Sequence, residues 1–429
     1  MENKKEKEIY LWSKTKKIYL ETDGTQTKLF IDEQEYQEFE ENKTPKVLSK
    51  EKLENTGKEQ ARSYYQNALK NYVFSNLVIL SGAGSSVKIG SSNDGNGGLT
   101  MGKLWEELNQ GDKLLNFNDF TTQSGYDTRD SKGELIRDLE KLLDAANRNQ
   151  VVHPELSAQI TIIKKFLIKK CTLELGESKT HETFLRKITK RKMKDSRVKL
   201  FTLNYDSLWE QAANKDRFTI IDGFNYASPR YFDGQMFDYD IVIREGNRIK
   251  EENSFVPKLF HLYKVHGSLN WYRQNGEIVQ KDFDLTDNGK NVGDIDADRL
   301  IVFPSDNKYE QSYEQPYFEM MSRFQRALRL ENTLLITIGF SFLDKHISSV
   351  IEESLKQNSS LNLVVVDPSI SIEKHNWERI FRYTKADNRT LLVGETFQEF
   401  AQEYPDNNSF EQEDLGANFA RIVKQALNH

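Results

Sequence analysis

The sequence predicts an α/β fold, with a mainly parallel sheet and helices on both of its faces. Short apolar runs of strand length recur along the 429 residues and alternate with segments whose apolar residues follow helical spacing. Such alternation favours a parallel sheet, because the crossover between parallel strands is usually a helix. Runs such as NLVIL at 76–80 are apolar throughout, which indicates strands buried on both faces.

The remaining elements follow from the same two patterns. Helical spacing covers 58–74, 317–330 and 344–357. The strand candidates are NLVIL (76–80), VKLFTLN (198–204), FTIID (218–222), KLFHLYKVHG (258–267), RLIVFP (299–304), TLLITIGF (333–340), LNLVVVD (361–367) and RTLLVG (389–394).

Composition divides the chain into three parts. Residues 1–57 are charge-dense with two short β-like runs, so we expect a small N-terminal arm or hairpin followed by a polar linker. Residues 58–405 form the main domain, interrupted by a helical insertion at 99–192 and an irregular aromatic insert at 223–255. We expect a C-terminal helix over 406–429.

Composition also excludes several classes of protein. Basic residues number 60 and acidic residues 66, so the net charge of −6 argues against strong nucleic-acid binding. The mean hydropathy is −0.70 and no run approaches ~20 apolar residues, so we expect a soluble protein with no membrane partner. The start MENKKEKEIY lacks the apolar core of a secretory signal, which favours a cytoplasmic location. The single cysteine, Cys171, excludes a multi-thiolate zinc site.

A glycine-rich turn follows the first buried strand. It consists of Gly82, Ala83, Gly84, Ser85 and Ser86. Small residues let backbone N–H groups approach a pyrophosphate, and a following helix N-terminus would favour its negative charge. The turn is neither G-x-G-x-x-G nor a Walker A loop. The alternative interpretation is an ordinary tight turn.

Polar residues stand at the ends of two further predicted strands. Asn204 and Asp206 follow VKLFTL, and His266 follows an apolar run and precedes a glycine. In open α/β sheets, ligands bind at the carboxyl ends of the strands. Asp206 could instead cap the next helix, and His266 could be a structural histidine.

Two later strands end in the same way. Gly339 and Ser341 follow TLLITI, and Asp344 then opens a helix. Asp367 ends LNLVVV, where a carboxylate can accept hydrogen bonds from a ribose diol. Its alternative role is a turn-forming Asp-Pro.

Together and in this order, the five motifs resemble those of the sirtuin superfamily. The motifs are GAGSS at 82–86, TLNYD at 202–206, HG at 266–267, GFS at 339–341 and VVVD at 364–367. The resemblance implies a Rossmann-like fold that binds NAD+, here as a substrate.

The chain departs from protein-deacylating sirtuins at two points. After the glycine-rich turn it reads VKIGSSNDGNGG, without the G-I-P-D-F-R segment, and it lacks the four cysteines of their zinc module. No zinc is therefore expected. The forms GFSFLDKHI and HGSLNW look more like bacterial sirtuin-like domains of antiphage defence, which implies NAD+ hydrolysis. Some members of that branch act with a separate HerA-like translocase ATPase.

The resemblance also implies roles for individual residues. Asn204 would position a water molecule or the ribose, and His266 would act as general base. Asp206 would help to form the nicotinamide pocket. The remaining contacts would be Gly82, Ala83, Gly84, Ser85 and Ser86 to the pyrophosphate, Gly339 and Ser341 to the phosphates or adenosine ribose, and Asp367 to the adenosine end.

The expected function is therefore an NAD+ glycohydrolase that releases nicotinamide and ADP-ribose. An unregulated enzyme of this kind would harm its own cell, so we expect gating by homo-oligomer assembly or by a partner. Two other functions stay open. One is an NAD+-dependent protein deacylase or ADP-ribosyltransferase, and the other is a non-catalytic nucleotide sensor or scaffold.

Overall fold

A computed structural model describes most of the chain. The described residues are 6–24, 26–40, 43–91, 97–110, 116–127, 129, 137–192, 195–243, 255–281, 299–301 and 315–406. Within them an eleven-stranded sheet has the order β4-β3-β2-β1-β15-β14-β13-β5-β6-β9-β7.

The part of this sheet from β15 to β7 is parallel throughout. It confirms the predicted sheet. Each of its strands lies within a run that the sequence marked as a strand candidate, except that β5 extends one residue further, to Ser81. The strands are β5 (Asn76–Ser81), β6 (Lys199–Thr202), β7 (Thr219–Ile221), β9 (Leu259–Lys264), β13 (Thr333–Ile338), β14 (Asn362–Val366) and β15 (Thr390–Val393).

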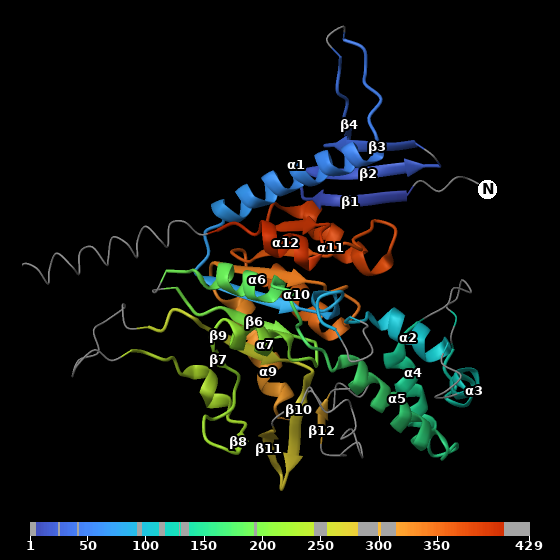
Figure 1. Cartoon of the computed structure of the whole chain (residues 1–429), viewed down its shortest axis with the longest axis vertical. Helices are drawn as coiled ribbons and strands as arrows, with labels where there is room; N and C mark the ends of the chain where they lie inside the picture. Colours follow the sequence, from blue (N-terminus) through green and yellow to red (C-terminus); the bar gives the residue numbers. More distant parts are fainter. Residues whose placement is uncertain are drawn as a thin grey trace, which may run out of the picture.

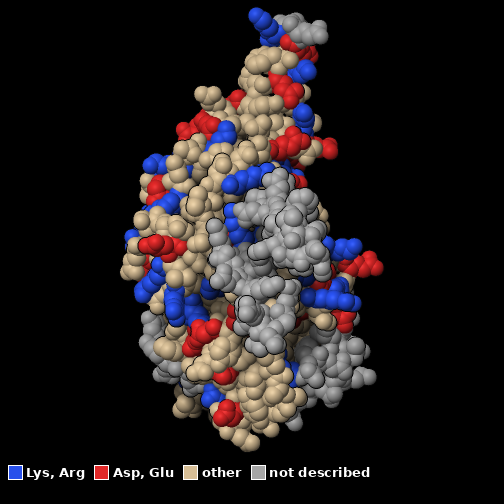
Figure 2. Space-filling view, turned by 90° about the vertical axis from the view of Figure 1, so that its left-hand side faces the viewer, with Lys and Arg blue, Asp and Glu red and all other residues tan. Residues whose placement is uncertain are grey.

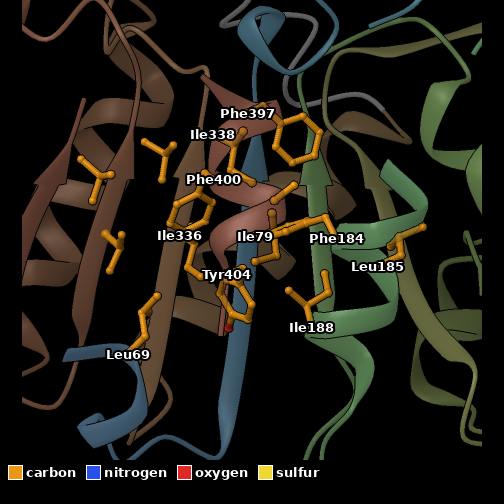
Figure 3. Packing of buried hydrophobic residues seen from close by; sticks show 14 of the residues in the cluster. Leu69, Ile79, Phe184, Leu185, Ile188, Ile336, Ile338, Phe397, Phe400 and Tyr404 are labelled. Carbon is orange, nitrogen blue, oxygen red and sulfur yellow. The ribbon is translucent and has the colours of Figure 1, made fainter. Parts of the chain in front are cut away.

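Helices cover both faces of the sheet, as predicted. Ile79, Ile336 and Ile338 point to one face, where they pack against Phe184, Phe400 and their neighbours (Figure 3). The alternate residues of the same strands, such as Val78 and Leu335, belong to the cluster on the opposite face. The first face carries α1 (Lys50–Asn71), α6 (Thr180–Thr189), α7 (Leu208–Lys215) and α12 (Phe397–Glu403), and the second carries α9 (Tyr317–Arg329), α10 (Lys345–Gln357) and α11 (His375–Ala386).

The N-terminal segment extends the main sheet. Its strands form an antiparallel meander, and β1 pairs antiparallel with β15. The expected polar linker is partly helical, because α1 begins at Lys50, where the Ser49 side chain accepts a hydrogen bond from the Lys52 N–H. The meander consists of β1 (Glu6–Trp12), β2 (Lys17–Asp23), β3 (Gln26–Ile31) and β4 (Gln34–Glu35).

The helical insertion divides into two parts. Its first four helices share a hydrophobic cluster of their own, and Figure 1 shows them beside the sheet. Its last helix, α6, covers the sheet itself. The four helices of this module are α2 (Met101–Gln110), α3 (Phe117–Gln123), α4 (Leu139–Asn149) and α5 (Leu156–Cys171).

A second, smaller sheet is formed by strands on both sides of β9 in the sequence and includes part of the aromatic insert. Its order is β12-β10-β11-β8. The RLIVFP run therefore contributes to this sheet rather than to the main one. Its strands are β8 (Arg230–Tyr231), β10 (Gly267–Gln274), β11 (Glu277–Gln280) and β12 (Arg299–Ile301). The helix expected over 406–429 lies outside the described residues, apart from Asp406.

The surface carries charges of both signs. Figure 2 shows Lys and Arg interspersed with Asp and Glu over the face that it presents. Among the described helices, none combines the length and apolar character that a membrane span requires.

The pairing of β1 with β15 depends on a glycine. The N–H of Gly394 donates to the carbonyl of Tyr10, and a Cβ at Gly394 would lie 1.7 Å from the carbonyl oxygen of Ile9. We expect Gly394→Ala to lower the free energy of unfolding by about 1–3 kcal/mol in urea titrations, because the strands must separate. Gly102→Ala is the matched control, since a Cβ there meets nothing within 4 Å and alanine favours helix α2. Equal stability of the two variants would contradict this.

Candidate active site at the carboxyl edge of the sheet

The parallel register aligns the ends of neighbouring strands. Ile338 of β13 pairs with Val366 on one side and with Ser81 of β5 on the other. Ser81 pairs with Thr202 of β6, which pairs in turn with Lys264 of β9. The segments that follow these five residues therefore leave the sheet side by side, at its carboxyl edge.

The predicted site residues lie in those segments. Asp367, Gly339 and Gly82 come directly after the aligned row, and Asn204 and His266 come two residues after it. The register thus brings residues from all five sequence motifs to one edge of the sheet, three of them directly after the row and two of them one residue further on.

The glycine-rich turn lies at the point where the strand order reverses. β6 follows β5 on one side, whereas β13 lies on the other side of β5. In open α/β sheets, the crevice at such a switch point is where ligands bind. The turns after β5 and β13 lie at this switch point.

These two turns touch through their backbones. A Cβ at Gly84 would lie 2.6 Å from the Cα of Gly339, and a Cβ at Gly82 would lie 2.6 Å from the Gly339 carbonyl oxygen. Gly339 itself has a φ of +58°, and its N–H donates to the carbonyl of Val366. A side chain at any of the three glycines would force the turns apart.

Most N–H groups of the glycine-rich turn bond within the protein. The N–H groups of Gly82 and Gly84 donate to carbonyls of the β13 end, and those of Ser85 and Ser86 donate to carbonyls of the turn itself. Ala83 is exposed. The turn forms a short 3-10 helix, and the next α-helix begins only at Met101. Direct contact of this turn with a pyrophosphate stays a prediction.

Asn204 is tied to the glycine-rich turn by its side-chain amide. Its Nδ2 lies 3.0 Å from the Gly82 carbonyl oxygen, 3.2 Å from the Ser85 Oγ and 2.9 Å from the Ser86 Oγ. The Ser86 hydroxyl donates in turn to the Asp206 carboxylate at 2.7 Å. The hydroxyl of Ser86 therefore links the two loops that end β5 and β6, and both serine side chains point inward.

Asp206 has both structural and electrostatic roles. Its Oδ1 accepts a hydrogen bond from the Leu208 N–H, so it supports the start of α7, as the alternative interpretation suggested. Burial raises the pKa of its carboxyl group, while the nearby charge of Lys264 and the Ser86 hydroxyl lower it.

His266 lies beside the first turn of α10. Its Nε2 is 3.4 Å from the Oδ2 of Asp344, and both side chains are largely buried. The other oxygen of Asp344 accepts from the N–H groups of His346 and Ile347, so it caps the helix. Helix capping fixes the carboxylate, which can then orient the imidazole.

The two remaining predicted contacts lie in the turns after β13 and β14. The Ser341 carbonyl accepts a hydrogen bond from Asn376. The Asp367 carboxylate accepts from both the N–H and the hydroxyl of Ser369, and burial raises the pKa of its carboxyl group. Asp367 thus stabilises its own turn here, and a contact to adenosine stays a prediction.

The sequence interpretation missed Lys264 and the pairing of Asp344 with His266. Lys264 is buried within an otherwise apolar and aromatic strand, and a lysine inside the run LFHLYKVHG was the available signal. The pairing of Asp344 with His266 depends on tertiary structure and left no local signal.

A polar cavity of about 540 Å³ lies away from these residues. It is lined by Gly234, Glu277, Glu319 and Arg323, among others, and none of the predicted site residues lines it. Arg323 is already paired with Asp238 and Glu319. The candidate site is therefore defined by the strand register and by hydrogen bonds, and not by this cavity. Within the described ranges, no group of His, Cys, Asp and Glu side chains could hold a metal ion.

Comparison with known families bears on this edge of the sheet. Residues 198–387 match the family model of a SIR2-like domain. The match supports the sirtuin-like superfamily that the motifs indicated. It spans less than half of the chain and includes Asn204, Asp206 and His266, whereas the SIR2-like match leaves out the glycine-rich turn.

Other comparisons add little. No curated protein matches the chain. Among solved structures, a sirtuin from work on the structural basis of sirtuin substrate affinity is 14% identical, with a TM-score of 0.36 over 80% of this chain and 96% of the other. A Sir2 structure in complex with the inhibitor EX-527, 2'-O-acetyl-ADP-ribose and a deacetylated p53 peptide is 13% identical, with a TM-score of 0.36 over 79% and 96%.

The raised pKa of Asp367 predicts a pH-dependent stability. A raised carboxyl pKa contributes stability below the ordinary value of about 3.9, and that contribution is lost as the pH rises through the folded-state value. Asp367→Asn keeps an oxygen acceptor for Ser369 and removes the titration. We therefore expect the variant to gain stability relative to the parent protein between about pH 3 and pH 7, measured by urea unfolding.

Asp32→Asn is the control with the opposite sign. Burial works to raise the pKa of Asp32, but hydrogen bonds from Lys16 and Lys17 outweigh it and lower the pKa. This variant should lose stability relative to the parent as the pH rises. Parallel slopes for the two variants would refute the assignment.

Proposed function

We propose that this protein is an NAD+ glycohydrolase, which cleaves the nicotinamide–ribose bond to give nicotinamide and ADP-ribose. The observation that supports it most is the placement of Asn204 and His266 at equivalent positions beyond β6 and β9, beside the switch point. The SIR2-like match spans both residues and supports an NAD-using enzyme. Hydrolysis as the outcome is our proposal.

The chemistry requires little acid catalysis at the leaving group. Nicotinamide leaves NAD+ as a neutral molecule while the ribose develops oxocarbenium character, and water then forms the new bond at C1′. The water loses one proton, which His266 would accept. Asn204 would hold the water or a ribose hydroxyl through its Oδ1 acceptor, since its Nδ2 donates within the protein to the glycine-rich turn. Asp344 would keep the imidazole oriented.

The alternative of protein deacylation receives less support from the chain. A four-cysteine zinc module cannot form in a sequence with one cysteine. A sensor or scaffold that only binds a nucleotide would not require the imidazole and amide to share one edge of the sheet. Turnover that depends on an acyl-lysine peptide would nevertheless favour deacylation.

Regulation by a second copy or by a partner ATPase stays a proposal. Strands β1–β4 pair into the main sheet, so the expected N-terminal arm has a structural role. Deleting residues 1–57 would remove these strands and the first part of α1, and it would test folding rather than gating.

Substitution of the two catalytic candidates tests the proposal. We expect His266→Ala and Asn204→Ala each to lower nicotinamide and ADP-ribose release about 100-fold or more, because proton transfer and positioning are lost. His375→Ala is the matched control, since that side chain is 93% exposed, and it should keep full turnover. Both products should be quantified by chromatography.

The outcomes separate the three functions. Turnover by the parent protein that both variants retain would refute the site. If the parent protein is inactive alone and with a co-encoded ATPase, the sensor or scaffold is favoured.

A further inference from the structure

Lys264 is a buried cation whose hydrogen bonds all go to one loop and the helix after it. The residue is 2% exposed. Its Nζ donates to the carbonyl of Asp206 at 2.5 Å, to the carbonyl of Tyr205 at 3.4 Å and to the Oε1 of Glu210 at 2.8 Å. An ammonium has three donors, so this lysine has one acceptor for each.

This arrangement connects the two catalytic candidates. Tyr205 and Asp206 directly follow Asn204 in the segment between β6 and α7, which lacks regular structure. Lys264 ends β9 and stands two residues before His266. A buried charge is costly unless its partners stay in place, so the lysine holds the loop carbonyls to the strand that carries the histidine.

The charges around Asp206 come from several elements. Lys264 faces it from β9 and Glu210 from α7, while the thiol of Cys171 faces it from the end of α5. One lysine thus stands against two carboxylates.

We propose that Lys264 is a positioning residue for NAD+ cleavage, which fixes Asn204 relative to His266 by holding the Tyr205 and Asp206 carbonyls. The inference rests on the proposed function, because it assigns the lysine to that reaction. The lysine touches the loop rather than the substrate, so its effect should pass through Asn204.

Lys264→Met removes the charge and the three donors while keeping an apolar chain. We expect kcat for NAD+ to fall about 10–100-fold with KM within a few-fold, as for a misplaced catalytic group. Lys258→Met is the matched control. Lys258 is exposed at the other end of β9 and also donates to a carbonyl of the α7 region, that of Asp216. The control should keep kcat.

A double-mutant cycle separates positioning from general loss of structure. If Lys264 acts through Asn204, then Lys264→Met should slow the Asn204→Ala protein little or not at all. Multiplication of the two effects would overturn the proposal. If Lys264→Met alone does not fold, the pair Lys264→Met with Glu210→Gln also removes the unpaired carboxylate, and it replaces the single variant in the cycle.

Amide hydrogen exchange provides a readout that does not depend on turnover. Lys264→Met should speed exchange in residues 203–207 and leave α10 unchanged, whereas unchanged exchange in 203–207 would refute the holding role. An inactive parent protein would instead refute the proposed function and the reaction assigned to the lysine, and exchange would still decide whether the lysine holds the loop.

Discussion

Two turns meet backbone to backbone where β5 and β13 end, and the geometry of the carboxyl edge depends on their contact. Gly84 lies so close to Gly339 that neither position has room for a Cβ. Hydrogen bonds from the Gly82 and Gly84 N–H groups to carbonyls at the end of β13 keep the two turns together. The serines of the glycine-rich turn are held at a fixed height above the sheet as a result.

A series of hydrogen-bonded polar groups connects the glycine-rich turn to the ends of β6 and β9. Asn204 donates to Ser86, which donates to Asp206, whose carbonyl accepts from Lys264. Each group provides a hydrogen-bond partner for the next. Moving one of them would leave a polar group without its partner, which is costly in a region of low dielectric. The hydrogen bonds of Lys264 thus connect the loop that follows Asn204 to the strand that precedes His266.

Much of the fold was predictable, because buried parallel strands are nearly pure apolar runs such as NLVIL and LNLVVV. Their order in the sheet and their register are tertiary properties, yet the polar residues at their ends were recognisable as a set. The sequence predicted that the first helix begins at residue 58, whereas α1 begins at Lys50. The capping signal of Ser49 was not recognised because charged residues surround it. No feature of the sequence indicated that N–H groups of the glycine-rich turn would donate hydrogen bonds within the protein, because two of their acceptors lie at the end of β13. For Lys264, the available sequence signal was a charged residue inside an apolar run.

The pairing of β1 with β15 has a consequence for the making of the protein. Leu11 of β1 pairs with Val393 of β15, so β1 can join the parallel strands only after β15 has been synthesised. At a synthesis rate of about 5–20 residues per second, a ribosome needs roughly 20–80 s to supply that partner. Throughout this interval the nascent chain carries an open strand edge with apolar residues, which is a template for pairing with other chains. Folding of this sheet therefore competes with the pairing of the β1 edge to another chain until Val393 has been synthesised.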